Sequence, residues 1–252
     1  MNQNERKLNN FKSKMKIIFD TYIDNTFDGR CQSEWRKQAL VYNYQSEFPS
    51  DRQARLLDVG IGRGEMLSLW QKLGYTSGYG VDISPSTVEF CQNLGLACEL
   101  IEDTVKFLQD KVGAYRLITL IDVLEHIPKE NLPGFLTALH NALDDEGKLI
   151  IQVPNMQAPE SYLHRYNDLT HEVGFCEHSF QQILLATDFE IIEFKGFEEY
   201  FGHTPQRILR RIVRGAYLLC VRLLRNINGN LNPRILHPVL IVIVRKRREK
   251  PC

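Results

Sequence analysis

A glycine-rich turn between two patterned segments most constrains the fold of this chain. The apolar run 55–59 predicts a short buried strand, and residues 66–73 predict a helix. Glycines occupy alternate positions between them, at Gly60, Gly62 and Gly64. Because glycine has no side chain, such a turn lets a ligand lie against the backbone, and the helix N-terminus then favours an anionic group. The turn therefore predicts a ligand site at the end of the first strand.

Strand and helix patterns alternate along most of the remaining chain. Further strands are expected at 77–83, 98–104, 115–121 and 148–153, a sixth near 191–194 and a last one at 239–244. Helices are expected at 1–28, 33–47, 85–94, 105–109 and 132–143, and after an N-cap at Ser179. This alternation predicts an α/β fold with a parallel sheet that binds ligands at the carboxyl ends of its strands.

Acidic residues recur at that predicted edge of the sheet. Asp58 lies just before the glycine turn, and Asp82 lies at the tip of the second strand. A carboxylate at the second position can accept two hydrogen bonds from a ribose diol, although a helix-capping role is the alternative. Asp103 and Thr104 follow the third strand, where they can border a base or Asp103 can cap the next helix.

Composition excludes several classes of protein. The chain has 252 residues, with 31 basic and 31 acidic side chains, which argues against a protein built around nucleic acid. Its six cysteines are scattered and lack metal-site spacing. No signal peptide or run long enough to span a membrane is recognisable, so we expect a cytoplasmic protein.

Four motifs in order resemble the signature of class I S-adenosylmethionine-dependent methyltransferases. They are Asp58–Gly64, Gly80–Ser84, Asp122–His126 and Gly147–Asn155. A nicotinamide dehydrogenase would instead place its third glycine where this chain has Glu65. The resemblance implies a Rossmann-like sheet of seven strands, mostly parallel with one antiparallel strand, with added N-terminal helices and a helical insertion before the last strand.

The resemblance also implies a cofactor, S-adenosylmethionine, and residues that bind it. The expected cofactor-binding residues lie at the carboxyl ends of the first four strands or just beyond them: Asp58, Gly60, Gly62, Gly64, Asp82, Ile83, Asp103, Thr104, Asp122 and Val123. The cofactor supplies a methyl group on a good leaving group, so the protein mainly has to align a nucleophile with it.

A polar and aromatic cluster at 165–172 follows the fifth strand and is expected to meet the acceptor. Together with Asn155, it resembles methyltransferases found with genes for bacterial O-antigen and other surface polysaccharides. The resemblance implies a hydroxyl of a sugar or lipid-linked glycan as acceptor, with Asn155, Arg165 and Tyr166 in contact with it. An O-methyltransferase of quinones or other lipophilic small molecules, and an inactive recruitment protein that binds the cofactor, are the alternatives.

A hydroxyl acceptor needs a group that takes its proton, and histidine titrates nearest neutral pH. His171 is the first candidate base, with Asp168 orienting it or binding a sugar hydroxyl. His126 is the rival base, although its pairing with Glu125 also fits an architectural role. A metal held by Asp168, His171 and Glu172 has only weak support from spacing, so no metal is expected.

The segment between the last two strands is a basic amphipathic helix. Its arginines between 205 and 225 fall within about 120° of the helix circumference at ~100° per residue. Residues 206–226 would suit an anionic membrane surface, which would make the protein peripheral to the inner face of the membrane. Core packing and a dimer surface are the alternatives, and the oligomeric state is left open.

We expect one structural domain with four parts. These are an N-terminal helical cap at 1–50, a cofactor-binding core at 51–204, the basic helical insertion at 205–235, and the last strand with a basic tail at 236–252. The helical cap either covers a ligand pocket or is a plain packing extension.

Overall fold

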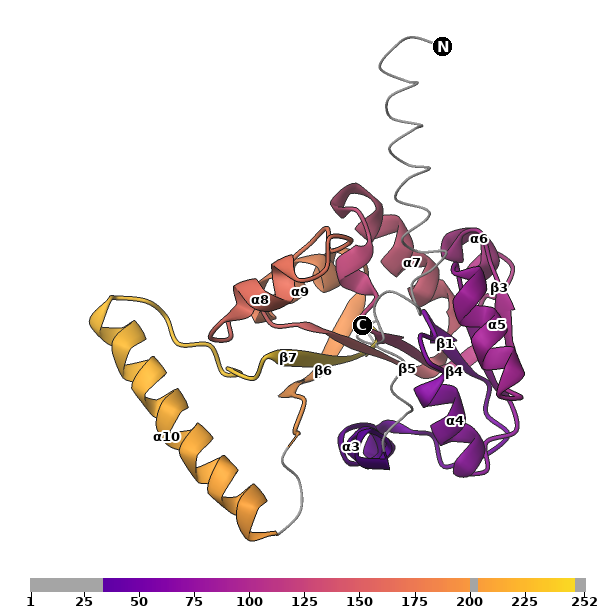
Figure 1. Cartoon of the computed structure of the whole chain (residues 1–252). Coiled ribbons are helices and arrows are strands. Elements are labelled where there is room, and N and C mark those ends of the chain that lie inside the picture. The colour runs from indigo at the N-terminus through magenta and orange to yellow at the C-terminus, as the bar shows by residue number, and fades with distance from the viewer. Residues whose placement is uncertain (1–33, 200–203, 248–252) are drawn as a thin grey trace.

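The computed structural model describes residues 34–199 and 204–247, which are organised around one seven-stranded sheet (Figure 1). The strands lie side by side in the order β3-β2-β1-β4-β5-β7-β6. Their bounds are β1 Leu56–Val59, β2 Gly78–Asp82, β3 Cys98–Leu100, β4 Tyr115–Ile121, β5 Leu143–Pro154, β6 Phe189–Gly196 and β7 Val239–Lys246. Strand β7 pairs antiparallel with both β5 and β6, whereas the other pairs are parallel. The predicted sheet with one antiparallel strand is confirmed.

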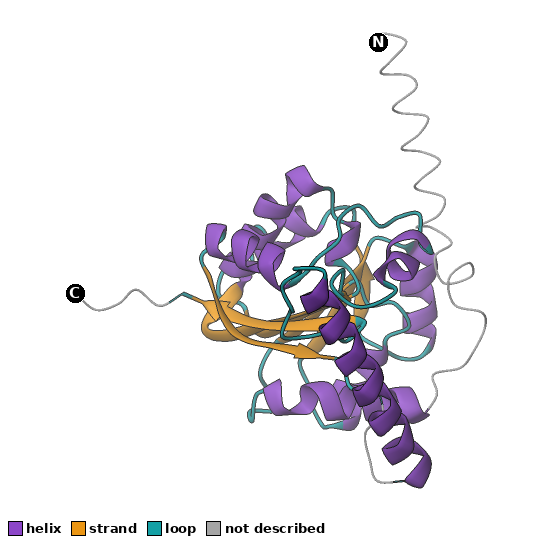
Figure 2. Ribbon diagram, turned by 90° about the vertical axis from the view of Figure 1, so that its left-hand side faces the viewer, coloured by secondary structure: helices purple, strands orange, loops and turns teal. Residues whose placement is uncertain are grey.

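Helices cover both faces of the sheet (Figure 2). Successive strand residues point to opposite faces, so Leu57 and Val59 pack in one core and Leu56 in the other. The first core is covered by α6, α7 and α9, and the second by α3, α4 and α5. The helix bounds are α3 Glu34–Tyr44, α4 Glu65–Lys72, α5 Pro85–Asn93, α6 Thr104–Leu108, α7 Leu132–Ala142, α8 Ser161–Tyr166, α9 Glu177–Ala186 and α10 Pro205–Ile227. The short 3₁₀ turns are η1 Gln45–Glu47, η2 Leu124–His126 and η3 Lys129–Asn131.

Three predicted boundaries are wrong, and α8 was not predicted. Strand β5 begins at Leu143, five residues before the expected start at 148. Helix α9 begins at Glu177, with Cys176 rather than Ser179 at its N-cap. The Ser179 hydroxyl instead accepts a hydrogen bond from the Cys176 N–H at 2.9 Å, as the third residue of a capping box does. Strand β3 ends at Leu100, because Asp103 already caps α6 by accepting the Lys106 N–H at 2.7 Å. The helix predicted at 1–28 lies outside the described residues.

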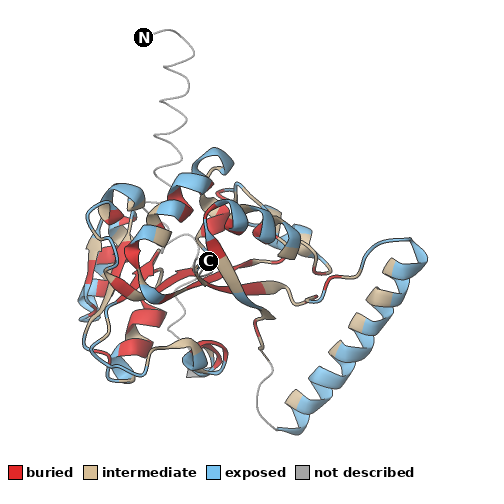
Figure 3. Cartoon of the chain, turned by 180° about the vertical axis from the view of Figure 1, so that it is seen from behind, coloured by how far each residue is buried: buried red, intermediate tan, exposed pale blue. Residues whose placement is uncertain are grey.

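Helix α10 stands apart from the sheet and its two helical layers (Figure 1). Its half-buried residues form one side of the helix, and the remaining surface is exposed, with no buried residue (Figure 3). The half-buried side includes Arg214, Arg222 and Arg225. Arg222 donates to the carbonyls of Pro233 and Arg234 at 2.9 and 3.0 Å. Arg225 donates to the carbonyl of Gln157 at 3.1 Å, so the arginines fasten the helix to the rest of the protein.

The apolar side of α10 faces away from the protein. Its exposed members are Ile208, Leu209, Ile212, Val213, Leu219, Leu223, Leu224 and Ile227. The core-packing alternative is therefore wrong, because this face does not contact the core. In the described part of the chain, no helix combines the length and the hydropathy that a bilayer crossing requires.

Candidate active site

A cavity of about 730 Å³ opens at the carboxyl ends of the parallel strands. Segments that follow β1, β2 and β4 line it, and α3 adds Arg36 and Leu40. Strands β2 and β4 lie on either side of β1, so the connections after β1 and β4 run to opposite sides of the sheet. Ligands of open α/β sheets bind at such switch points. The tertiary fold thus brings the glycine turn and most of the marked acids to one cavity.

The three glycines of the turn have positive φ angles of 75°, 49° and 69°. Gly60 and Gly62 line the cavity, whereas Gly64 is buried beside Leu96 and Cys91. A Cβ atom on Gly60 would collide with the side chain of Val123. At Gly62 a Cβ atom would meet nothing within 4 Å, so the backbone there is open to a ligand.

Two aspartates face this cavity next to the turn. Asp58 is almost completely buried and accepts the Thr119 hydroxyl at 2.6 Å. Burial raises the pKa of Asp58 to about 7, although the hydrogen bond from Thr119 opposes this shift. Asp82 accepts the Ser84 N–H at 2.8 Å. Burial raises the pKa of Asp82 to about 6, and hydrogen bonds from backbone groups that include Gly62 limit the rise.

Ile83, Asp103 and Thr104 also line the cavity. The Ile83 side chain is exposed there, as expected for a group that covers a ligand. One oxygen of Asp103 is engaged by the α6 N-terminus, so the capping role is observed and the other oxygen remains for a ligand.

Asp122 and Val123 leave β4 at the cavity wall. Asp122 has a φ of 56° and accepts the Gln152 side-chain amide at 2.8 Å. Gln152 in turn accepts the hydroxyl of Tyr44, which is fully buried on α3. Asp122 is exposed toward the cavity, and the protein groups around its carboxylate still reduce its hydration and raise its pKa. Tyr44 and Gln152 had no recognisable signal in the sequence, because their roles depend on this long-range chain of hydrogen bonds.

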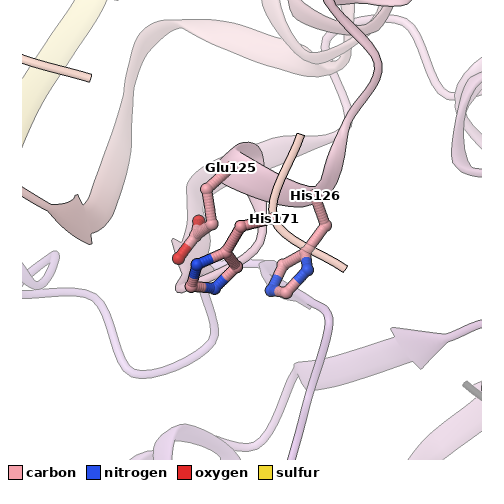
Figure 4. A group of neighbouring side chains, drawn as sticks. All are labelled: Glu125, His126 and His171. Carbon is pink, nitrogen blue, oxygen red and sulfur yellow. The ribbon is translucent and has the colours of Figure 1, made fainter. Parts of the chain in front are cut away.

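His126 and His171 come together although they are far apart in the sequence (Figure 4). Their ring centroids lie 4.7 Å apart, and His126 lines the cavity. The His126 Nδ1 atom lies 2.8 Å from the Thr170 hydroxyl, which donates to Asp168 at 2.6 Å. Burial lowers the pKa of His126 to about 4, and His171 adds to this shift. The three predicted catalytic residues are thus neighbours: Thr170 links His126 to Asp168, and the His126 ring contacts that of His171.

The predicted acceptor-binding residues do not line this cavity. Asn155 is fully buried, and its amide donates to the carbonyls of Ile235 and His237 at 3.0 and 2.9 Å. Arg165 donates to the carbonyls of His171 and Glu172, and Tyr166 is mostly exposed. The structure therefore gives Asn155 and Arg165 positioning contacts within the chain.

Helix α3 provides cavity residues for which the sequence carried no specific signal. The Arg36 guanidinium contacts the Glu65 carboxylate at 3.1 Å, next to the N-terminus of α4. Arg36 and Leu40 thus place the described part of the N-terminal region at the cavity wall.

Comparisons with known proteins agree with this architecture. A family model described as a methyltransferase domain matches residues 33–194. A S-adenosylmethionine-dependent methyltransferase from Archaeoglobus fulgidus has a similar structure, with a TM-score of 0.62 and 21% identity over 92% of this chain and 99% of its own. No curated protein matches the sequence.

Two further solved structures have the same fold. The 1,6-didemethyltoxoflavin-N1-methyltransferase of Burkholderia thailandensis, solved with S-adenosylhomocysteine, has a TM-score of 0.58 and 16% identity, covering 98% of this chain and 92% of its own. A S-adenosylmethionine-dependent methyltransferase from Mesorhizobium loti has a TM-score of 0.58 and 15% identity, covering 82% of this chain and 98% of its own. The chain belongs to the methyltransferase-domain family, with the fold of S-adenosylmethionine-dependent methyltransferases.

Proposed function

We propose that the protein transfers a methyl group from S-adenosylmethionine to a hydroxyl of a sugar or lipid-linked glycan. The observation that carries the proposal is one cavity with an open glycine backbone at Gly62 and a histidine, His126, among its lining residues. The Gly62 backbone suits a cofactor that lies against the main chain, and His126 suits an acceptor that must lose a proton.

The described residues fit the cofactor. Gly60 and Gly62 would contact its methionine end, and the Asp82 carboxylate would accept hydrogen bonds from its ribose hydroxyls. The Asp58 carboxylate would accept a hydrogen bond from the cofactor's amino group, while Ile83, Asp103 and Thr104 would border the adenine. Asp122 and Val123 would lie nearest the reacting centre. Gly64 would support the turn by packing instead of contacting the cofactor.

When bound, S-adenosylmethionine supplies a methyl group attached to a sulfonium sulfur. The acceptor oxygen forms a bond to the methyl carbon as the carbon–sulfur bond breaks, with its electron pair going to sulfur. The acceptor proton leaves at the His126–His171 pair, which remains the proposed site of acceptor activation. Asp168 would act through Thr170 by orienting His126.

The proposal is tested with the full-length protein, radiolabelled S-adenosylmethionine and a panel of acceptors. The panel contains nucleotide sugars, lipid-linked oligosaccharides and a hydroquinone. We expect label in the carbohydrate, and loss of most of it in His171→Ala with bound cofactor unchanged. Label in the hydroquinone alone would establish the lipophilic-acceptor alternative. Cofactor binding without any transfer across a wide acceptor set would support the recruitment protein.

We further propose that α10 docks on an anionic membrane surface, where a lipid-linked acceptor would be found. The helix contains six arginines and no acidic residue, and its apolar side is exposed along its whole length. A helix with these two faces lies in the membrane interface with its apolar side toward the acyl chains. Arginines at the edge of the inner side, such as the exposed Arg210 and Arg211, would meet lipid phosphates. An anionic lipid surface would neutralise the positive charge of the arginines that flank the apolar side, whereas a second copy would supply no negative charge from this helix, so we favour lipid as the occupant.

Sedimentation with vesicles tests this docking. The protein should sediment with vesicles that contain phosphatidylglycerol and much less with phosphatidylcholine alone. The triple variant Leu209→Ser, Ile212→Ser, Leu223→Ser should remain in the supernatant, because it loses apolar surface on the outer face. Val112→Ser is the matched control, since Val112 is exposed in a turn far along the chain from α10. A stable dimer that ignores vesicles and dissociates in the triple variant would assign this face to a second copy.

A further inference from the structure

We propose that Glu125, His126 and His171 form a binding site for a divalent transition-metal ion. One potential ligand atom from each residue lies within 4.8 Å of the other two (Figure 4). Two imidazoles and one carboxylate are a donor set that proteins use for Zn²⁺ and similar ions. The set differs from the Asp168, His171 and Glu172 combination considered from spacing, because Glu125 and His126 take the places of the two acids.

The Glu125 side chain provides the first argument. It is 2% exposed, and neither carboxylate oxygen has a hydrogen-bond partner in the described structure. A buried carboxyl group without partners costs free energy, whether it is ionised or protonated. Asp122 and Asp168 lie close enough to repel negative charge on Glu125. A bound cation would remove both costs, and a structural packing role would remove neither.

The hydrogen bonds of the two rings provide the second argument. The His171 Nδ1 atom lies 2.8 Å from the carbonyl oxygen of His164, so this nitrogen carries the proton and Nε2 carries the lone pair. The Thr170 hydroxyl gives its one proton to Asp168, so it accepts from His126 Nδ1. Metal-binding histidines are typically oriented in this way by a carbonyl or carboxylate behind the ring.

The backbone holds the two halves of the site together. The N–H groups of Glu172 and Val173 donate to the Glu125 carbonyl at 2.7 and 3.1 Å. Arg165 donates to the carbonyls of His171 and Glu172, which fixes the same loop from its other side. Metal–nitrogen bonds of ~2.1 Å place tetrahedral ligand atoms ~3.4 Å apart. Side-chain shifts of about 1 Å would therefore bring the three ligand atoms, now within 4.8 Å of one another, to the spacing that a bound ion requires.

The inference rests on the proposed function for its chemical meaning. Three protein ligands leave coordination positions open, and His126 places the ion at the wall of the cavity. An ion there would bind a hydroxyl of the acceptor and lower its pKa, so that the proton could pass to water in the cavity during attack. With their lone pairs on the ion, the two histidines would then act as metal ligands in place of accepting the proton themselves. Such a site would favour acceptors with neighbouring hydroxyls, because two oxygens could occupy the open positions.

Direct metal binding tests the proposal without reference to activity. The metal-stripped, full-length protein is dialysed against Zn²⁺, Mn²⁺ or Co²⁺, and bound metal is measured. We expect one equivalent of at least one ion, and at least tenfold weaker binding in Glu125→Gln, His126→Ala and His171→Ala. Visible absorption of bound Co²⁺ should change in His171→Ala. His178→Ala is the matched control, since His178 is an exposed histidine on α9.

Folding and cofactor binding are checked separately. Glu125→Gln keeps the size of the side chain, so it should retain the circular dichroism spectrum and the affinity for S-adenosylhomocysteine. The proposal is wrong if none of the three ions binds at about millimolar concentration, or if a bound ion is indifferent to all three substitutions. If metal binds as expected and no hydroxyl acceptor is methylated, the metal site stands and the proposed acceptor fails.

Discussion

At the scale of single residues, the three glycines of the turn serve different purposes. Gly60 is required because a side chain would collide with Val123, and Gly64 because one would collide with Leu96. Only Gly62 combines a positive φ with open space at the cavity wall. A side chain at Gly62 would therefore occupy the space of the proposed cofactor as well as strain the backbone.

Gly62→Ala and Gly113→Ala separate these two effects. Gly113 has a φ of 64° and open space around its Cα, but it lies outside the cavity lining. Both variants should lose about 1–2 kcal/mol of stability from the left-handed backbone. Only Gly62→Ala should also weaken S-adenosylhomocysteine binding, by at least tenfold in calorimetry. Equal affinities in the two variants would remove Gly62 from the cofactor site.

At the scale of elements, α3 is joined to the sheet by a buried polar chain. Tyr44 on α3 donates to Gln152 on β5, and Gln152 donates to Asp122 after β4. Buried hydrogen-bonded groups of this kind fix one arrangement, because every alternative leaves a polar atom unsatisfied. The helix thus positions Asp122 at the cavity although it is remote in sequence.

Tyr44→Phe tests the importance of this chain. It leaves the Gln152 carbonyl oxygen buried without its donor, which should cost about 1–3 kcal/mol in urea unfolding. Affinity for S-adenosylhomocysteine should also fall, because Asp122 loses its support. The control Tyr217→Phe removes a half-exposed hydroxyl from α10 and should change stability by less than about 0.5 kcal/mol. Wild-type stability in Tyr44→Phe would mean that Gln152 finds another donor.

At the scale of the whole molecule, ligand binding and stability are linked through two aspartates. Burial raises the pKa of Asp58 to about 7 and that of Asp82 to about 6 in the ligand-free fold. In the unfolded chain an aspartate has a pKa of about 3.9. Between pH ~4 and ~7 the folded state therefore binds more protons than the unfolded state, and these two groups make the free energy of unfolding fall as pH rises.

The proposed cofactor contacts require ionised carboxylates and so favour loss of these protons. The increase in melting temperature on adding S-adenosylhomocysteine should therefore grow from pH 5.5 to pH 7.5, as measured by thermal unfolding at fixed ligand concentration. Asp82→Asn should show a smaller increase and a weaker dependence on pH. An increment that stays constant over this range in the wild-type protein would contradict both assigned contacts.

The sequence by itself determined the fold and the position of the ligand-binding edge. Glycines at alternate positions, an acid at the end of each of the first four strands and the alternation of strand and helix are local patterns. Local patterns can be recognised from the sequence alone, because backbone conformation and strand periodicity depend mainly on neighbouring residues. The place of the cavity follows from them, because parallel sheets bind ligands at the carboxyl ends of their strands. The seven-stranded sheet with one antiparallel strand was expected from the resemblance to a known family, and the tertiary structure shows the order of its strands.

Only the tertiary structure decided which polar groups meet and which face of α10 contacts the protein. The pairing of His126 with His171 depends on a loop that donates backbone hydrogen bonds to Glu125. The amide of Asn155 binds the carbonyls of residues 235 and 237, a long-range contact that no local pattern indicates. The periodicity of α10 defined two faces, but an amphipathic pattern does not say which face is inward. Here Arg222 and Arg225 donate hydrogen bonds to backbone carbonyls elsewhere in the chain, and the apolar face of α10 is exposed.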